Sequence, residues 1–292
     1  MSLRDAATPL AVALIWGVNI PLMKAGLAHL DPFVFNALRL TLSAVALGMA
    51  DRLQTADREP PASTPWRSIV WFGLLSSFAY QILFVVGMDA TSAGNAAILV
   101  ASAPIWTAVF ARLRGMERHP VRAWVALAVA FAGTVLVTTT GTRAGTDAGG
   151  ATLAGNLAVL AAMLAWAWAT VVSRPMLETF PATRLAFLAT LVSLPGHWVL
   201  AAPRLRAPDP EHAAFLVAAI LYSGVLSTGI AYALWNRSVL RFGAARTASL
   251  NNLVPVVALL VAWAFLGEVP GAVQVAGGAL VVLGLFAWHG TR

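Results

Sequence analysis

Uncharged stretches of about 20 residues run through almost the whole chain. Nine of them lie at 6–23, 68–88, 90–111, 123–142, 148–173, 185–203, 213–236, 247–267 and 269–291, and a tenth, 32–50, is interrupted only by Arg39. A helix needs about 20 mainly apolar residues to cross the bilayer, where lipid offers its backbone no other hydrogen-bond partner. The sequence therefore predicts an all-α polytopic membrane protein with ten transmembrane helices.

Composition agrees with this interpretation and leaves no room for a second, soluble domain. The chain has 292 residues, of which 59% are hydrophobic and 11% charged, whereas about 25% of the residues in a soluble domain are charged. The longest polar stretch, 51–67, is too short for a domain. A net charge of +7 would suggest nucleic acid in a soluble chain. Here the basic residues lie in short loops, so the expected partner is the lipid bilayer and not nucleic acid.

The basic residues fall unevenly on the two sides of the predicted bundle. Of the 19, Arg39 lies within a span, one side carries Lys24, Arg143, Arg204 and Arg206, and the opposite side carries the remaining 14. Positive residues are preferentially retained in the cytoplasm, so both termini are expected there. The first span lacks the features of a cleaved secretory signal and is expected to remain as a helix.

The chain repeats itself after about 150 residues. LAVALIW at 10–16 recurs as LAAMLAW at 160–166, and Gly133 corresponds to Gly284. Pro104 precedes Glu117 by 13 residues, as Pro255 precedes Glu268. Residues 1–142 and 143–292 would each hold five spans, and because five is odd the second half would enter the membrane from the opposite side. Such inverted repeats favour a carrier with a central site.

Motifs for catalysis and for cofactor binding are missing. The chain has no Cys and a single Lys, Lys24, so it has no thiolate metal site and no Walker A loop of its own, and no ATPase subunit is evident. No paired carboxylates or metal-ligand patterns occur. We therefore expect no enzyme, no catalytic residue, no metal and no cofactor. Arg39 and His197 lie within spans, and Arg39 would either hold a substrate carboxylate or tie neighbouring helices together.

Two prolines lie at equivalent places in the fourth and ninth spans. Pro104 would free the carbonyl of Val100, and Pro255 that of Asn251. Paired kinks could act as hinges around a central cavity, or could only bend the helices for packing.

Polar and aromatic residues within the spans fall at helical spacing, so several share one helix face. Together these faces could line one cavity rich in aromatic rings and amides, although helix packing or an aromatic belt at the membrane surface would give similar patterns. The candidate substrate-binding residues are Asn19, Tyr80, Ser102, Trp106, Trp166 and Tyr232.

Four segments carry a resemblance to a known family: WGVNIPLMKAGL at 16–27, DPFVFNALR at 31–39, TSAGNAAILVASAPIWTAVFA at 91–111 and NNLVPVVALLVAWAFLGE at 251–268. They resemble the drug/metabolite transporter superfamily, specifically its EamA-type ten-helix exporters, and most of all bacterial inner-membrane exporters of aromatic amino acids. GMER at 115–118 departs from the usual GE dipeptide. The resemblance implies alternating access through a central cavity, with the fifth and tenth helices peripheral. It also implies an inner (plasma) membrane location and a small-molecule substrate, an amino acid.

Two alternatives remain at this level. The chain could export another small metabolite or drug of the same superfamily, such as a nucleoside or sugar derivative. A cationic drug would favour a buried membrane carboxylate, which the spans lack. The chain could also be a membrane scaffold or enzyme that transports nothing.

Overall fold

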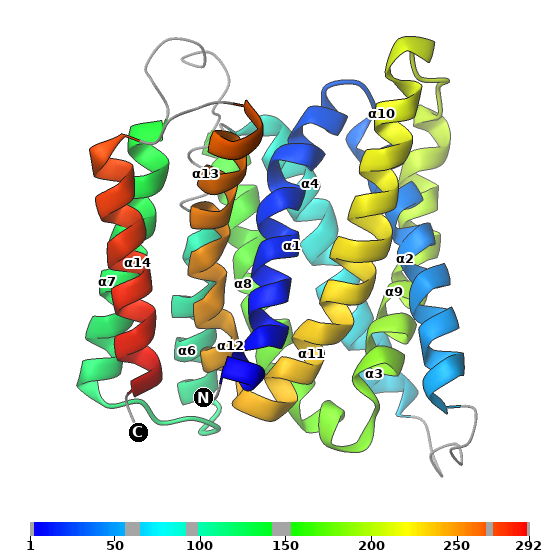
Figure 1. Cartoon of the computed structure of the whole chain (residues 1–292). Helices are drawn as coiled ribbons and strands as arrows, with labels where there is room; N and C mark the ends of the chain where they lie inside the picture. The colour runs from blue at the N-terminus through cyan, green and yellow to red at the C-terminus, as the bar shows by residue number, and fades with distance from the viewer. Residues whose placement is uncertain (1–2, 56–64, 92–98, 142–152, 267–270, 291–292) are drawn as a thin grey trace.

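The computed structural model describes residues 3–55, 65–91, 99–141, 153–266 and 271–290. All regular secondary structure in these ranges is helical, and the helices run side by side in one bundle (Figure 1). The first half holds α1 (Leu3–Leu27), α2 (Pro32–Thr55), α3 (Trp66–Gly73), the π-helix η1 (Leu74–Ala79), α4 (Tyr80–Ala90), α6 (Ala103–Leu113) and α7 (Val121–Gly141).

The second half is also helical throughout its described elements. It holds α8 (Leu153–Thr179), α9 (Ala182–Ala201), the 3-10 turn η2 (Ala202–Arg204), α10 (Pro210–Leu221), the π-helix η3 (Tyr222–Ile230), α11 (Ala231–Phe242), α12 (Ala244–Ser249), the 3-10 turn η4 (Leu250–Asn252), α13 (Leu253–Leu266) and α14 (Ala272–Gly290). The beginning of α1 and the end of α14 lie at the same end of the bundle (Figure 1).

Several helices have the length and composition of membrane spans. Within the described residues, six are long and apolar enough to cross a bilayer: Ala7–Leu27, Pro32–Gln54, Trp66–Ala90, Leu153–Thr179, Ala182–Arg204 and Pro210–Phe242. Shorter apolar helices cover Leu99–Leu113, Val121–Leu136 and Ala272–Trp288. The predicted all-α membrane fold is confirmed, while the count of ten crossings stays a prediction. Predicted landmarks at Glu268 and in the loops around Arg58 and Arg143 lie outside the described residues.

Large apolar side chains cover the outside of the bundle as well as its core. Met49, Trp71 and Phe286 are exposed, which suits a surface in contact with lipid. Inside, the largest buried cluster includes Met23 of α1, Phe35 of α2 and Trp235 of α11. The core therefore lies between helices of the two halves.

Two of the long helices contain a π-helical segment, η1 and η3, at equivalent places in the two halves. A π segment shifts the backbone bonds by one residue and leaves a carbonyl that needs another donor. Two hydroxyls donate to carbonyls at or next to these segments: Ser76 Oγ donates to the Phe72 carbonyl at 2.7 Å, and Thr228 Oγ1 to the Ser223 carbonyl at 2.8 Å. Both hydroxyl residues line the cavity described below.

Helices α7 and α14 pair closely at one edge of the bundle (Figure 1). A Cβ added to Gly133 would lie 2.6 Å from the carbonyl oxygen of Gly277, and one added to Gly284 would lie 2.6 Å from the backbone nitrogen of Ala130. Glycine at both positions lets the two backbones approach as closely as they do, which is a common way for helices to associate in lipid.

Candidate functional site

A cavity lies between the helices of the two halves. Its volume is about 80 Å³. Its walls come from both halves and from both π segments. The lining residues are Trp16, Asn19, Ile20, Arg39, Ser76, Tyr80, Gln81, Phe84, Val100, Met163, Trp166, Ser227, Thr228, Tyr232, Asn251 and Val254.

Aromatic rings form one wall of this cavity around Trp166 of α8. The Trp166 ring lies 5.0 Å from Tyr80, 5.8 Å from Tyr232 and 5.6 Å from Trp16, the last pair edge to face. Trp235 packs behind it at 5.4 Å. Because aromatic pairs at these separations attract one another, the rings hold each other in place and present a firm apolar surface.

Hydroxyl and amide groups are held beside the rings by bonds between helices. Tyr232 Oη donates to Ser76 Oγ at 2.9 Å. Ser223 Oγ donates to Asn19 Oδ1, which joins η3 to α1. Trp16 Nε1 donates to the Ser227 carbonyl at 3.1 Å. The polar wall is thus positioned largely by the π segments.

Arg39 of α2 brings a guanidinium group to the cavity wall, and its side chain is buried. Its Nε donates to Asn36 Oδ1 at 2.8 Å, its Nη2 to Gln81 Oε1 at 2.6 Å and its Nη1 to Thr228 Oγ1 at 3.4 Å. Both roles considered for Arg39 thus have geometric support, because it faces the cavity and also ties α2 to α4 and η3.

His197 of α9 extends this network away from the cavity. Its Nε2 lies 2.8 Å from the Ser77 carbonyl, which can only accept, so Nε2 carries a proton. Its Nδ1, 3.2 Å from Asn36 Nδ2, then accepts from that amide. Asn36 therefore links His197 to Arg39, and His197 acts as a buried structural partner of η1.

The structure brings together four of the six predicted substrate-binding residues. Asn19, Tyr80, Trp166 and Tyr232 all line the cavity. Ser102 and Trp106 are not among its lining residues: Trp106 Nε1 donates to Ser102 Oγ at 3.2 Å, and Ser102 Oγ donates to the Leu99 carbonyl at 2.6 Å.

Lining residues that sequence reasoning missed include Gln81 and Ser227. The matching pairs Ser76-Ser77 and Ser227-Thr228, at the repeat distance, were the available signal.

The two predicted hinge prolines follow breaks in their helices. The helix that begins at Leu99 is interrupted at Ser102, and Pro104 is the second residue of α6. Pro255 is the third residue of α13, directly after the 3-10 turn η4. Val100 and Asn251, whose carbonyls the prolines were expected to free, both line the cavity. The irregular backbone therefore lies next to the cavity in both halves.

A second, smaller cavity, too narrow in this conformation to hold a water molecule, adjoins the first and shares Ser76, Trp166 and Tyr232 with it. It extends along α8 past Thr170 toward the C-terminal end of that helix. Three of its buried polar atoms, Thr170 Oγ1, Trp235 Nε1 and Asn236 Nδ2, have no hydrogen-bond partner within the described part of the chain. Such groups are costly in a membrane interior.

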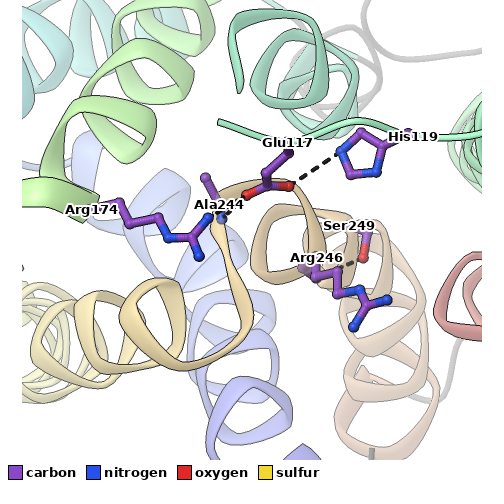
Figure 2. Close-up of polar contacts among 6 residues, drawn as sticks. All are labelled: Glu117, His119, Arg174, Ala244, Arg246 and Ser249. Atoms are coloured by element: carbon purple, nitrogen blue, oxygen red, sulfur yellow. Dashed lines mark hydrogen bonds and ion pairs between the residues drawn. The ribbon is translucent and has the colours of Figure 1, made fainter. Parts of the chain in front are cut away.

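Beyond the small cavity, a cluster around Glu117 joins the two halves (Figure 2). Glu117 follows α6, and its Oε1 accepts from the backbone nitrogen of Ala244 at 2.7 Å and pairs with Arg174 Nη1 of α8 at 3.4 Å. Its Oε2 lies 3.2 Å from His119 Nε2. We call Glu117, His119, Arg174 and Ala244 the Glu117 tie.

Local geometry and charge both favour the Glu117 tie. Gly243, at the start of α12, has a φ of +89°, and a Cβ there would lie 2.7 Å from Glu117 Oε1, so a residue larger than glycine would disturb the bond. Burial raises the pKa of the Glu117 carboxyl. Hydrogen bonds from His119 and Ala244 and the charges of His119 and Arg174 lower it further than burial raises it, so the pKa lies below its ordinary value of 4.5.

Comparison with known proteins places this architecture in a family. The model of the EamA-like transporter family matches the chain twice, at residues 7–139 and 153–288. The chain belongs to the EamA-like transporter family. EamA transporters are multi-pass membrane proteins, and the family indicates a transporter and not an enzyme.

Relatives of this EamA transporter match it over nearly their full length. A Salmonella typhimurium protein named as a probable amino-acid metabolite efflux pump is 25% identical, over 98% of this chain and 95% of its own. A Streptantibioticus cattleyicolor protein named as a probable terminal-alkyne amino-acid exporter is 28% identical, over 98% and 93%. One solved crystal structure superimposes with a TM-score of 0.79 at 20% identity, over 98% and 96%, and shares the fold.

Proposed function

We propose that this EamA transporter exports amino acids, with aromatic ones favoured, by alternating access through the cavity. The observation that carries the proposal is the pairing, in one cavity, of a wall of aromatic rings with a wall of amides and hydroxyls. The relatives named for amino-acid export support it. A zwitterion needs polar partners when it leaves water, whereas its ring needs apolar contact. Each contact with an aromatic ring contributes about 0.5–1.5 kcal/mol, which suits a carrier that must also release its solute.

Each candidate residue has a role in this proposal. Asn19, Tyr80, Trp166 and Tyr232 contact the solute in the cavity. Ser102 and Trp106 lie on the broken helix beside it and meet the solute in another conformation. Pro104 and Pro255 act as hinges, because each begins a new helical segment next to the cavity.

The proposed architecture consists of ten helices in two inverted halves, 1–142 and 143–292. The double family match supports it. A reciprocal contact supports it as well: Gly133 meets Gly277 and Val281, and Gly284 meets Ala126 and Ala130. Adding 151 to the residue numbers 133, 126 and 130 gives 284, 277 and 281, as a two-fold relation between the halves requires. The proposed location is the inner (plasma) membrane with both termini in the cytoplasm.

Counterflow into liposomes that contain the purified protein tests the proposal. We expect uptake of labelled phenylalanine, and we expect Trp166→Ala to reduce it about fivefold or more while reducing leucine uptake less. The fivefold figure corresponds to about 1 kcal/mol of lost ring contact. Trp71→Ala is the matched control, because Trp71 is 72% exposed on the outside of α3. It should leave uptake unchanged.

Other outcomes of the counterflow experiment would favour an alternative function. Equal losses for phenylalanine and leucine would give Trp166 a structural role and remove the aromatic preference. Uptake of a nucleoside or a sugar derivative in place of amino acids would favour the second class of substrate. A folded protein that moves no solute at all would be a scaffold.

A further inference from the structure

We infer that Arg39 binds the carboxylate of the transported solute, so that this carrier selects solutes that bear one. The inference rests on the proposed function and names the residue that decides substrate charge. Its starting point is a guanidinium group that lines the cavity, is only 3% exposed and lies within a membrane helix. A charge in that position is costly and is retained where it has a task.

Within the described ranges, Arg39 has hydrogen-bond partners but no oppositely charged partner. Its three partners, Asn36, Gln81 and Thr228, are neutral side chains. Among the residues that the structure describes, Arg39 takes part in none of the ion pairs, and all of those pairs lie outside the cavity. A buried cation with neutral partners keeps its desolvation cost uncompensated. A solute carboxylate would supply the missing charge, whereas an acidic side chain in the cavity would compete with the solute for it.

The hydrogen bonds of Arg39 leave the donors that a carboxylate needs. A guanidinium has five N–H groups, one on Nε and two on each Nη. The three bonds use the Nε–H, one N–H of Nη1 and one of Nη2. One N–H remains on each Nη, and a carboxylate can accept that pair through its two oxygens. The bond to Asn36 also fixes the orientation of the planar group, which lysine could not reproduce.

The surroundings of Arg39 fit an amino acid with an apolar side chain. Arg39 and Gln81 contribute to the same cavity as Trp166 and Trp16, so a solute held by its carboxylate still lies among aromatic rings. Within the described residues, the cavity lining includes no acidic side chain to hold a free amine. A carboxylate should therefore be essential for binding, and an ammonium group should not suffice.

Competition in phenylalanine counterflow tests the inference with two analogues. 3-Phenylpropionate keeps the carboxylate and lacks the amine, whereas phenethylamine keeps the amine and lacks the carboxylate. We expect the acid to compete at least about tenfold more strongly than the amine. Equal competition, or stronger competition by the amine, would overturn the inference without any variant.

Variants at Arg39 separate binding from structural support. Arg39→Gln should raise the half-saturating phenylalanine concentration about tenfold or more and abolish the advantage of the acid over the amine. Arg39→Lys, which keeps the charge, should recover part of both. A folded Arg39→Gln protein that keeps the wild-type preference would show that Arg39 is only a tie between helices.

Direct binding distinguishes failure of this inference from failure of the proposed function. Trp16 and Trp166 lie in the cavity wall, so ligand binding should change tryptophan fluorescence. If the wild type carries no amino acid yet binds 3-phenylpropionate and not phenethylamine, amino-acid export is wrong and the role of Arg39 stands. If it binds both equally or neither, the role of Arg39 is wrong.

Discussion

The buried polar groups beside Trp166 that lack a hydrogen-bond partner in the described residues lower the stability of the folded protein. Thr170 is buried on α8, and its hydroxyl is one of three polar atoms of the small cavity without a partner within the described part of the chain. An unsatisfied buried hydroxyl costs roughly 1–3 kcal/mol. Because the small cavity adjoins the main one, a solute moving along α8 would find these groups free to bind it.

Thr170→Val should therefore stabilise the protein and slow transport. Valine keeps the shape and removes the unpaired hydroxyl, so we expect the midpoint of thermal unfolding in detergent to rise and counterflow to fall about twofold or more. The control is Thr190→Val, because Thr190 Oγ1 is buried and already donates to the Ala186 carbonyl at 2.9 Å; it should give no gain in stability. A Thr170→Val protein that is less stable would show that the hydroxyl has a partner in solution.

The sequence pattern pointed to aromatic residues that line the cavity, but it did not show the position of every candidate residue. Helical spacing grouped Trp166 with cavity-lining residues, and α8, which carries it, is a single continuous helix. Tyr80 and Tyr232 also line the cavity, although each follows a π segment. Trp106 follows the break at Ser102 and is not among the lining residues. The neutral surroundings of Arg39 depend on contacts from three helices, which no local pattern encodes.

At the scale of elements, the chain could be divided into helices from its uncharged windows, but their internal breaks could not be predicted. The windows 68–88 and 213–236 coincide with helices that contain η1 and η3. A π segment depends on side-chain contacts such as the bonds from the Ser76 and Thr228 hydroxyls to nearby backbone carbonyls. That is a matter of side-chain geometry rather than of hydropathy.

The Glu117 tie joins the loop after α6 to α8 and to the start of α12. We expect it to keep the end of the small cavity beside the tie closed. Glu117→Gln removes the ion pair with Arg174 and the carboxylate that contacts His119. In a protein that also carries Thr170→Cys, Glu117→Gln should raise several-fold the rate at which a thiol reagent labels position 170. A partly exposed ion pair contributes up to about 1 kcal/mol. Asp51→Asn is the control, because it removes the Arg184 ion pair between α2 and α9. Equal labelling in both variants would make the tie a local anchor.

The pH dependence of the tie follows from its lowered carboxyl pKa. A depressed pKa means that the ionised form is favoured in the folded protein, so the contribution is present above 4.5 and is lost as the pH falls through the lowered value. The ratio of counterflow rates between Glu117→Gln and wild type should therefore stay constant from pH 6 to pH 8. A ratio that changes in this range would mean that a group other than the Glu117 carboxyl controls the tie.

For the molecule as a whole, the uneven distribution of arginine predicts the orientation in the membrane. The chain has no cysteine, so single cysteines can be introduced without background labelling. Cysteine at Arg206, in the loop before α10, should react with an impermeant thiol reagent added outside intact cells, and cysteine at Arg118 should not. Labelling at position 118 and not at 206 would reverse the orientation, since positive residues would then face outward against the usual preference.

The pairing of α7 with α14 has a consequence for how the protein is made. Within the described residues, α7 packs more extensively against α14 than against any other helix, yet α14 leaves the ribosome about 130 residues after α7. While about 130 further residues are synthesised, the face of α7 that carries Gly133 contacts lipid instead of α14. The arrival of α14 therefore buries the face of α7 that carries Gly133, and a chain released before residue 271 would leave α7 as a substrate for membrane quality control.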